Sequence, residues 1–304
     1  MATVLVTRHL PDGALMPLAA HEVRIRADDS PYSRSELVEA VVDVDAIVCV
    51  LTDRLDAEVL FAASKLRVIG NVAVGLDNID MSVAQAAGIQ VINTPGALDE
   101  TTADLAFALI LAASRGTSDA ERDLRAGSWP GWSLLDHLGR DVYGATLGLV
   151  GYGRIAHAVA RRAVGFDMTV LHWSRRATGE PGYVADLDEL LVRSDIVSLH
   201  VPLTESTRHL IGARELALLG PNAVIVNTAR GAVIDEDALA DALEHGRIFS
   251  AGLDVYSDEP RVSPALLAAP RTMLLPHIGS ATAATRRRMA SIVTSGVAAA
   301  LAGT

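Results

Sequence analysis

The chain alternates between two patterns of apolar and polar positions along most of its length. Short runs rich in β-branched residues are each followed by an Ala- and Leu-rich amphipathic stretch. The first pattern is typical of buried strands and the second of helices, so the sequence predicts a parallel sheet covered by helices. The strands expected in the first third are TVLVT (3–7), EVRIR (22–26), AIVCVL (46–51), LRVIGNV (66–72) and IQVINT (89–94).

A second series of strands follows after an interruption. Between the two series, residues 101–114 are apolar on nearly every face, which predicts a helix buried on all sides, as a connector between two domains would be. Residues 125–144 contain Gly, Pro and two tryptophans and are expected to be irregular. After His277 the pattern is helical, and this tail could return to the first domain. The strands expected here are TLGLVGYG (146–153), MTVLHW (168–173), DIVSLHV (195–201), AVIVNTA (223–229), SAGLDVY (250–256) and TMLLPHI (272–278).

Composition narrows the classes of partner. A length of 304 residues favours two domains, and a net charge of −11 argues against nucleic acid, which needs a basic surface. Cys49 is the only cysteine, which excludes a cysteine metal cluster, and we expect no metal. The longest apolar run, 105–113, is shorter than the ~20 residues of a membrane span. We therefore expect a soluble, cytoplasmic protein without nucleic-acid or membrane partners.

A glycine-rich loop joins the first strand of the second series to a helical stretch. It has the pattern G-x-G-x-x-A, and its residues are Gly151, Gly153, Arg154, Ile155 and Ala156. The first glycine allows a tight turn, the second lets the backbone approach a pyrophosphate, and the alanine lets helix and strand pack closely. Since a second strand ends about 20 residues later, the motif predicts a dinucleotide site.

That second strand ends in Ser174, Arg175 and Arg176. An NAD site usually has Asp or Glu at the position of Ser174, where it accepts hydrogen bonds from the ribose hydroxyls. A hydroxyl with two guanidiniums instead attracts a 2′-phosphate. The sequence favours NADP(H), with NAD(H) as the alternative; otherwise the arginines belong to an exposed surface turn.

Three later strands lead into charged side chains, namely Arg230, Glu259 and His277. Open parallel sheets bind ligands at the carboxyl ends of their strands. Arg230 could hold a carboxylate through two parallel hydrogen bonds, and His277 could carry a proton near neutral pH. Glu259 beside the imidazole would stabilise its protonated form. With a nicotinamide hydride, these groups suit reduction of a 2-keto acid.

Two further polar residues near strand ends have two interpretations each. His200 is either structural or adjacent to the cofactor. Asp254 either accepts a hydrogen bond from the nicotinamide carboxamide or caps a turn.

Motifs along essentially the whole chain resemble those of the D-isomer-specific 2-hydroxyacid dehydrogenase family. The resemblance implies an α/β fold: a Rossmann doubly wound parallel-sheet domain, residues 98–278, inserted into a smaller flavodoxin-like α/β substrate domain, residues 1–97 and 279–304. It also implies a homodimer. The motifs are NVAVGLDNID (71–80), NTPGALDETTAD (93–104), LGLVGYGRIA (147–156), HVPLTEST (200–207), VNTARGAVIDEDAL (226–239), GLDVYSDEP (252–260) and PHIGSATAATRRRM (276–289).

The resemblance also assigns roles to residues. It implies an Arg–Glu–His catalytic site of Arg230, Glu259 and His277. Trp129 and Trp132 fall in the region of the dimer interface of relatives; one of them could close the active site of the partner subunit, or both could simply pack a long loop. Substrate would contact the backbone amides of Val74 and Gly75 and the side chain of Leu51. Further cofactor contacts would come from Thr102, Val201, Pro202, Thr207, Thr228, Ala229 and Gly279.

Within the family, the PHIGSAT segment and the basic turn are most similar to the glyoxylate and hydroxypyruvate reductase branch. The resemblance thus predicts reduction of a small 2-keto acid to the D-2-hydroxy acid with NADPH. Alternative substrates are 2-ketogluconate, pyruvate and phenylpyruvate, and NADH is an alternative cofactor. Formate oxidation is disfavoured, because that branch pairs its His with Gln. A dinucleotide-sensing, corepressor-like binding protein is disfavoured, because the chain has no long tails.

Overall fold

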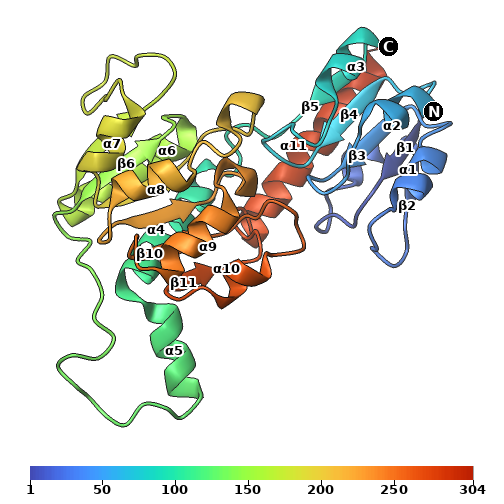
Figure 1. Cartoon of the computed structure of the whole chain (residues 1–304). Helices are drawn as coiled ribbons and strands as arrows, with labels where there is room; N and C mark the ends of the chain where they lie inside the picture. Colours follow the sequence, from blue (N-terminus) through green and yellow to red (C-terminus); the bar gives the residue numbers. More distant parts are fainter. Residues whose placement is uncertain (304) are drawn as a thin grey trace. The chain divides into compact units, whose positions relative to one another are not determined.

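The computed structural model describes residues 1–303 and contains two compact units. The first consists of Met1–Leu98 and Ser280–Thr304, and the second of Asp99–Gly279, so the second is inserted into the sequence of the first (Figure 1). Each unit has its own parallel sheet with helices between successive strands. The α/β fold class predicted from the sequence is confirmed.

The sheet of the first unit has the strand order β2-β1-β3-β4-β5, and its neighbouring strands are parallel. This is the flavodoxin-like order that the resemblance implies. Each strand lies within one of the expected apolar runs. The strands are β1 (Thr3–Val6), β2 (Glu22–Ile25), β3 (Ala46–Cys49), β4 (Val68–Asn71) and β5 (Gln90–Ile92).

Helices cover both faces of this sheet. One face packs against three short helices and the other against the long C-terminal helix and a 3₁₀ turn. A Cβ on Gly70 in β4 would lie 2.5 Å from Val293 Cγ1 of that helix, so glycine permits the close packing. The helices are α1 (Arg34–Ala40), α2 (Ala57–Ala62), α3 (Met81–Ala86) and α11 (Ala283–Ala302), with the 3₁₀ turn η1 (Met16–Leu18).

The sheet of the second unit has the order β11-β10-β9-β8-β6-β7, again with parallel neighbours. A parallel bridge from His172 to Tyr183 adds a single residue beside β7. It stands where the Rossmann order has a third strand, which this sequence does not predict. The strands are β6 (Thr146–Val150), β7 (Thr169–Trp173), β8 (Ile196–Leu199), β9 (Val224–Asn227), β10 (Ser250–Leu253) and β11 (Thr272–Leu274).

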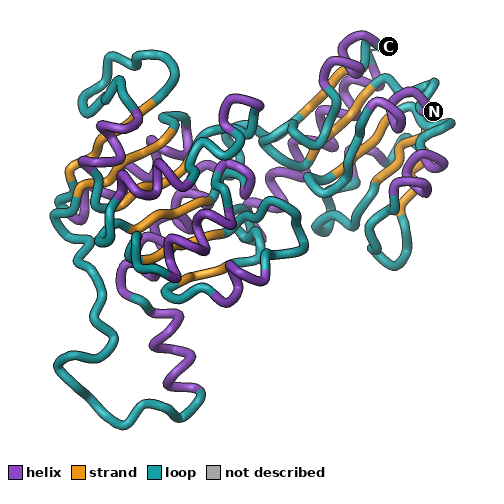
Figure 2. Tube along the Cα trace, in the orientation of Figure 1, coloured by secondary structure: helices purple, strands orange, loops and turns teal. Residues whose placement is uncertain are grey.

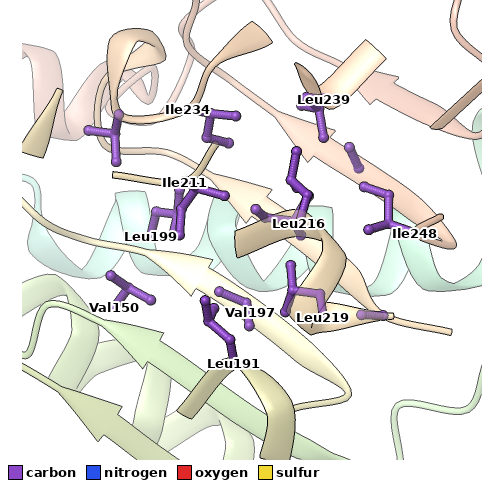
Figure 3. Packing of buried hydrophobic residues seen from close by; sticks show 14 of the residues in the cluster. Val150, Leu191, Val197, Leu199, Ile211, Leu216, Leu219, Ile234, Leu239 and Ile248 are labelled. Atoms are coloured by element: carbon purple, nitrogen blue, oxygen red, sulfur yellow. The ribbon is translucent and has the colours of Figure 1, made fainter. Parts of the chain in front are cut away.

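The second sheet is also covered on both faces, as a doubly wound sheet requires. α7 to α10 bury leucines on one face, and Figure 3 shows part of this cluster, including Leu191, Leu216 and Leu239. α4 and α6 cover the other face. The helices are α4 (Asp99–Arg115), α5 (Thr117–Arg125), α6 (Arg154–Ala163), α7 (Leu187–Arg193), α8 (Ala213–Leu219), α9 (Glu236–Glu244) and α10 (Pro264–Ala268), with 3₁₀ turns η2 (Val164–Phe166), η3 (Glu205–Thr207) and η4 (Gly231–Val233).

The prediction that residues 101–114 are buried on all sides is wrong for one stripe of α4. Asp104 and Ala108 lie four residues apart and are exposed, whereas Phe107 and Ile110 are buried in the core. Asp104 pairs with Arg162 at 2.5 Å. The apolar pattern misleads here because alanine is compatible with both core and surface.

α5 and the irregular segment after it project from the second sheet (Figures 1 and 2). Residues 126–143 are irregular, as expected, whereas α5 is not among the helices predicted from the sequence. The segment exposes large apolar side chains: Leu124, Trp129, Trp132, Leu134, Leu135, Leu138 and Tyr143. Across residues 1–303, no helix combines the length and the hydrophobicity of a membrane span.

Candidate active site

The three charged residues predicted from strand ends lie at one edge of the second sheet. β9, β10 and β11 are parallel neighbours, so their carboxyl ends meet at the same edge. Arg230 follows β9, Glu259 follows β10 and His277 follows β11. The structure therefore brings together a guanidinium, a carboxylate and an imidazole.

His277 and Glu259 are hydrogen-bonded to each other. His277 Nδ1 lies 2.7 Å from Glu259 Oε2, and Glu259 Oε1 accepts the Tyr256 N–H at 3.0 Å. Burial alone would raise the pKa of Glu259. The hydrogen bonds from His277 and Tyr256, together with the positive charges of His277 and Arg230, outweigh burial. The pKa of Glu259 is therefore below its ordinary value. Glu259 is therefore an ionised partner for one ring nitrogen, and Nε2 has no hydrogen-bond partner within residues 1–303.

Asp254 holds the backbone around His277. His277 has a φ of 55°, a left-handed conformation that is uncommon for a residue other than glycine. Asp254 accepts the N–H groups of Ile278 at 2.7 Å and Gly279 at 2.8 Å, and Thr102 Oγ1 donates to Gly279 O at 3.2 Å. Burial raises the pKa of Asp254, although the two N–H groups oppose this. The structure shows the turn-capping role of Asp254; contact with a carboxamide stays a prediction.

A buried amide shapes the turn that carries Arg230. Asn227 Nδ2 donates to Arg230 O at 2.9 Å, and Asn227 Oδ1 accepts the Ala229 N–H at 2.9 Å. Arg230 Nη1 donates to Ala229 O at 2.8 Å. Asn227 is not among the residues predicted from the sequence. The pattern that could have found it is an amide side chain at the end of the apolar strand VIVN.

The glycine loop has the space and the donors of a phosphate site. Gly151 has a φ of 92°, and a Cβ there would lie 2.8 Å from the carbonyl carbon of His200, so only glycine fits. A Cβ on Gly153 would meet nothing within 4 Å. The N–H groups of Arg154 and Ile155, which open α6, have no acceptor in the described chain. These features fit a pyrophosphate at a helix N-terminus.

The basic turn predicted beside this loop is free to bind an anion. Ser174, Arg175 and Arg176 follow β7, which pairs with β6. Ser174 Oγ donates to Arg176 O at 2.6 Å. Both guanidiniums are exposed, and neither forms a hydrogen bond or ion pair with residues 1–303. Two unpaired guanidiniums suit a phosphate group.

Two histidines that are not among the predicted site residues support the same turn. His172 Nε2 lies 2.8 Å from Thr178 Oγ1, and His157 Nε2 lies 3.2 Å from Glu180 Oε1. Tyr152 of the glycine loop stacks on His172, with ring centroids 3.6 Å apart. These contacts tie the basic turn to the glycine loop.

The other predicted cofactor residues include two threonines whose hydroxyl groups differ in their hydrogen bonding. Thr228 Oγ1 is buried and has no partner within residues 1–303, as a hydroxyl that awaits a ligand would be. In contrast, Thr207 Oγ1 donates to Pro202 O at 2.6 Å and accepts the Thr204 N–H at 2.8 Å, so this hydroxyl already stabilises its own turn. Val201 is buried and Ala229 half-buried.

His200 combines features of both interpretations. Its Nε2 lies 2.9 Å from Ser198 Oγ, and burial lowers its pKa to about 4, so it is a neutral residue at neutral pH. Its backbone also packs against Gly151. It is therefore structural and lies beside the glycine loop.

Known proteins are similar to this chain both in sequence and in fold. The NAD binding domain of the D-isomer specific 2-hydroxyacid dehydrogenases matches residues 107–279, more than half of the chain. A glyoxylate reductase of Korarchaeum cryptofilum (strain OPF8) is 48% identical over 299 residues, which are 95% of this chain and 90% of the relative. The chain belongs to the D-isomer specific 2-hydroxyacid dehydrogenase family.

Solved structures agree with the family. The TT0316 protein of Thermus thermophilus has a TM-score of 0.93 at 42% identity, over 99% of this chain and 97% of its own. An NADPH-dependent glyoxylate/hydroxypyruvate reductase of Sinorhizobium meliloti, solved with NADP and malonate, has a TM-score of 0.86 at 34% identity, over 97% and 92%. As a family member, this protein is an oxidoreductase that uses a nicotinamide dinucleotide.

Besides Arg230 and His277, three predicted substrate contacts of this dehydrogenase lie in the first unit. Leu51 follows β3, and Val74 and Gly75 follow β4; the two strands are parallel neighbours, so both loops lie at one edge of that sheet. The N–H groups of Val74 and Gly75 have no acceptor among the described residues. Free backbone amides suit a carboxylate, and this role stays a prediction.

Proposed function

We propose that the protein reduces glyoxylate and hydroxypyruvate to the corresponding 2-hydroxy acids, of D configuration where the product is chiral, with NADPH. The observation that carries the proposal is the hydrogen bond from His277 to Glu259 beside Arg230, at the ends of three neighbouring strands. The names of relatives at 48% and 46% identity, both glyoxylate reductases, support the substrate class.

Each catalytic residue has a separate role in the reduction of the substrate. Bound cofactor supplies the hydride for the carbonyl carbon. His277 Nε2 donates a proton to the carbonyl oxygen, and ionised Glu259 stabilises the imidazolium through Nδ1 until that transfer. Arg230 binds the substrate carboxylate by a bidentate contact and polarises the adjacent carbonyl. In the first unit, Val74 and Gly75 bind the carboxylate through their amides and Leu51 lines the pocket.

The cofactor residues favour NADP(H), with NAD(H) as a weaker cofactor. The free guanidiniums of Arg175 and Arg176 and the absence of a carboxylate at Ser174 support binding of a 2′-phosphate. We assign the pyrophosphate to the loop of Gly151 and Gly153 with the first turn of α6. The remaining contacts are Thr102, Val201, Pro202, Thr207, Thr228, Ala229, Asp254 and Gly279.

The organisation of the enzyme follows from the same proposal. Residues 1–97 and 279–304 form the substrate domain, and residues 98–278 form the cofactor domain.

The protein is a homodimer in the cytoplasm. The exposed apolar side chains of α5 and residues 126–143, including Trp132 at 82% exposure, support a subunit contact there. The free, buried thiol of Cys49 suits a reducing compartment.

Initial rates for a panel of 2-keto acids with each cofactor test the proposal. We expect the highest kcat/KM for glyoxylate or hydroxypyruvate with NADPH. Higher values for pyruvate, 2-ketogluconate or phenylpyruvate would replace the substrate assignment and leave the reaction type in place. If NADPH is not consumed with any 2-keto acid, the proposed function is wrong.

A further inference from the structure

Three asparagines of the first unit hold the backbone of its two candidate substrate loops. Asn93 Nδ2 donates to Val74 O at 2.8 Å, and Asn71 Nδ2 donates to Gly75 O at 2.9 Å. Both carbonyls of the dipeptide Val74–Gly75 are therefore bound by side-chain amides. Neither bond belongs to a helix or a strand ladder, so the two asparagines replace the secondary structure that this loop lacks.

Asn78 connects this loop to the one that contains Leu51. Its Nδ2 lies 3.2 Å from Val50 O and 3.0 Å from Asp53 O, and its Oδ1 accepts Asn71 Nδ2 at 3.0 Å. Asn71, which is buried, and Asn78, which is half-buried, thus form one amide pair that joins the loops after β3 and β4. A hydrogen-bonded network of this kind is rigid when every member has a partner.

The asparagines bind the carbonyl groups of the loop and leave its N–H groups unused. Val74, Gly75 and Leu76 are half-buried, and their three successive N–H groups have no acceptor within residues 1–303. Successive free amides form a concave donor site for anions. Because the carbonyls are held, the loop cannot turn to satisfy these donors itself.

We propose that Asn71, Asn78 and Asn93 are positioning residues that keep the amides of Val74, Gly75 and Leu76 available for the substrate carboxylate. This inference rests on the proposed function, which places the carboxylate at that loop. All three side chains act through their NH₂ groups on carbonyl oxygens. Aspartate has nearly the same shape and cannot donate, so it is the sharpest substitution.

Asn93→Asp tests the proposal with the least risk to folding, because Asn93 is half-buried and makes a single such bond. We expect KM for glyoxylate and for hydroxypyruvate to rise by the same factor, about tenfold, because both acids share the carboxylate. KM for NADPH and kcat should stay within about twofold of the parent values. Asn78→Asp should give the same pattern, and exposed Asn222→Asp is the control that should change nothing.

If Asn93 had a purely structural role, the result would differ. Asn93→Asp would then have a lower melting temperature and an unchanged KM for both keto acids, and this outcome would overturn the proposal. Unequal KM changes for the two acids would also overturn it, since they would indicate a pocket that contacts the rest of the substrate.

Binding of oxamate, a carboxylate that does not react, separates this inference from the proposed function. In the parent protein, oxamate should shift the amide ¹H–¹⁵N signals of Val74 to Leu76, and in Asn93→Asp the same shifts should need about tenfold more oxamate. Shifts without any keto-acid reduction would mean that the proposed function fails alone. Normal reduction without shifts at these amides would mean that the inference fails alone.

Discussion

His277 Nδ1 lies 2.7 Å from Glu259 Oε2, and this contact orients the imidazole at the carboxyl edge of the second sheet. The carboxylate itself is fixed by the Tyr256 N–H. Because one ring nitrogen is occupied in this way, only Nε2 can exchange a proton with a substrate.

Glu259→Gln should lower kcat/KM for glyoxylate by at least about tenfold. Hydrogen bonds and nearby positive charges lower the pKa of Glu259, so its carboxylate is charged throughout the neutral range. The neutral amide cannot stabilise positive charge on the His277 ring as the carboxylate does. Steady-state rates at neutral pH measure the loss. The exposed pair residue Glu189, changed to Gln, is the control; a parent-like kcat/KM in Glu259→Gln would contradict the assigned role.

Arg230→Lys should lower kcat/KM for glyoxylate by about 10- to 100-fold, because an ammonium cannot make two parallel hydrogen bonds to a carboxylate. The exposed Arg193→Lys variant serves as the reference in the same steady-state assay. Parent-like kinetics for Arg230→Lys would show that the carboxylate binds elsewhere.

The double variant Ser174→Asp with Arg175→Ala should shift cofactor preference towards NADH. The new carboxylate repels a 2′-phosphate and accepts hydrogen bonds from the ribose hydroxyls, and one guanidinium is lost. The ratio of kcat/KM for NADPH to that for NADH should fall by at least about tenfold. An unchanged ratio would place the 2′-phosphate away from this turn.

His200→Gln should make stability less dependent on pH. Burial lowers the pKa of His200 to about 4, whereas the unfolded residue titrates near 6.5. Between these values the unfolded chain binds a proton that the folded chain does not, so the parent loses up to about 3 kcal/mol as pH falls through this window. Chemical unfolding at pH 7 and pH 4.5 measures the difference. The control is His245→Gln, whose side chain is 64% exposed; equal losses in parent and His200→Gln would contradict this account.

Much of this molecule is predictable from local patterns. Every strand was expected, because the β-branched runs are short and separated by amphipathic helices. Arg230, Glu259 and His277 could be named in advance, because a charged residue after an apolar strand lies at the ligand-binding edge of a parallel sheet. The resemblance to a family then supplied residues with no chemical pattern of their own, such as Val74 and Leu51.

Other features depend on contacts between residues far apart in sequence. Nothing local indicates that Asn93 reaches Val74 or that His157 reaches Glu180. α5 is not predicted because its nine residues are mostly polar and none of them is buried. Where the Rossmann order has a third strand, this sheet has only an isolated bridge at Tyr183, which is too short to leave a periodic pattern.

The most direct measurement compares hydroxypyruvate reduction by the parent and His277→Ala, with NADPH consumption and the chirality of the product recorded together. The account predicts D-glycerate in amounts equal to the NADPH consumed by the parent. It predicts turnover lower by roughly 10²–10⁴-fold in His277→Ala, with NADPH binding unchanged. Near-parent turnover in His277→Ala, or L-glycerate from the parent, would contradict it.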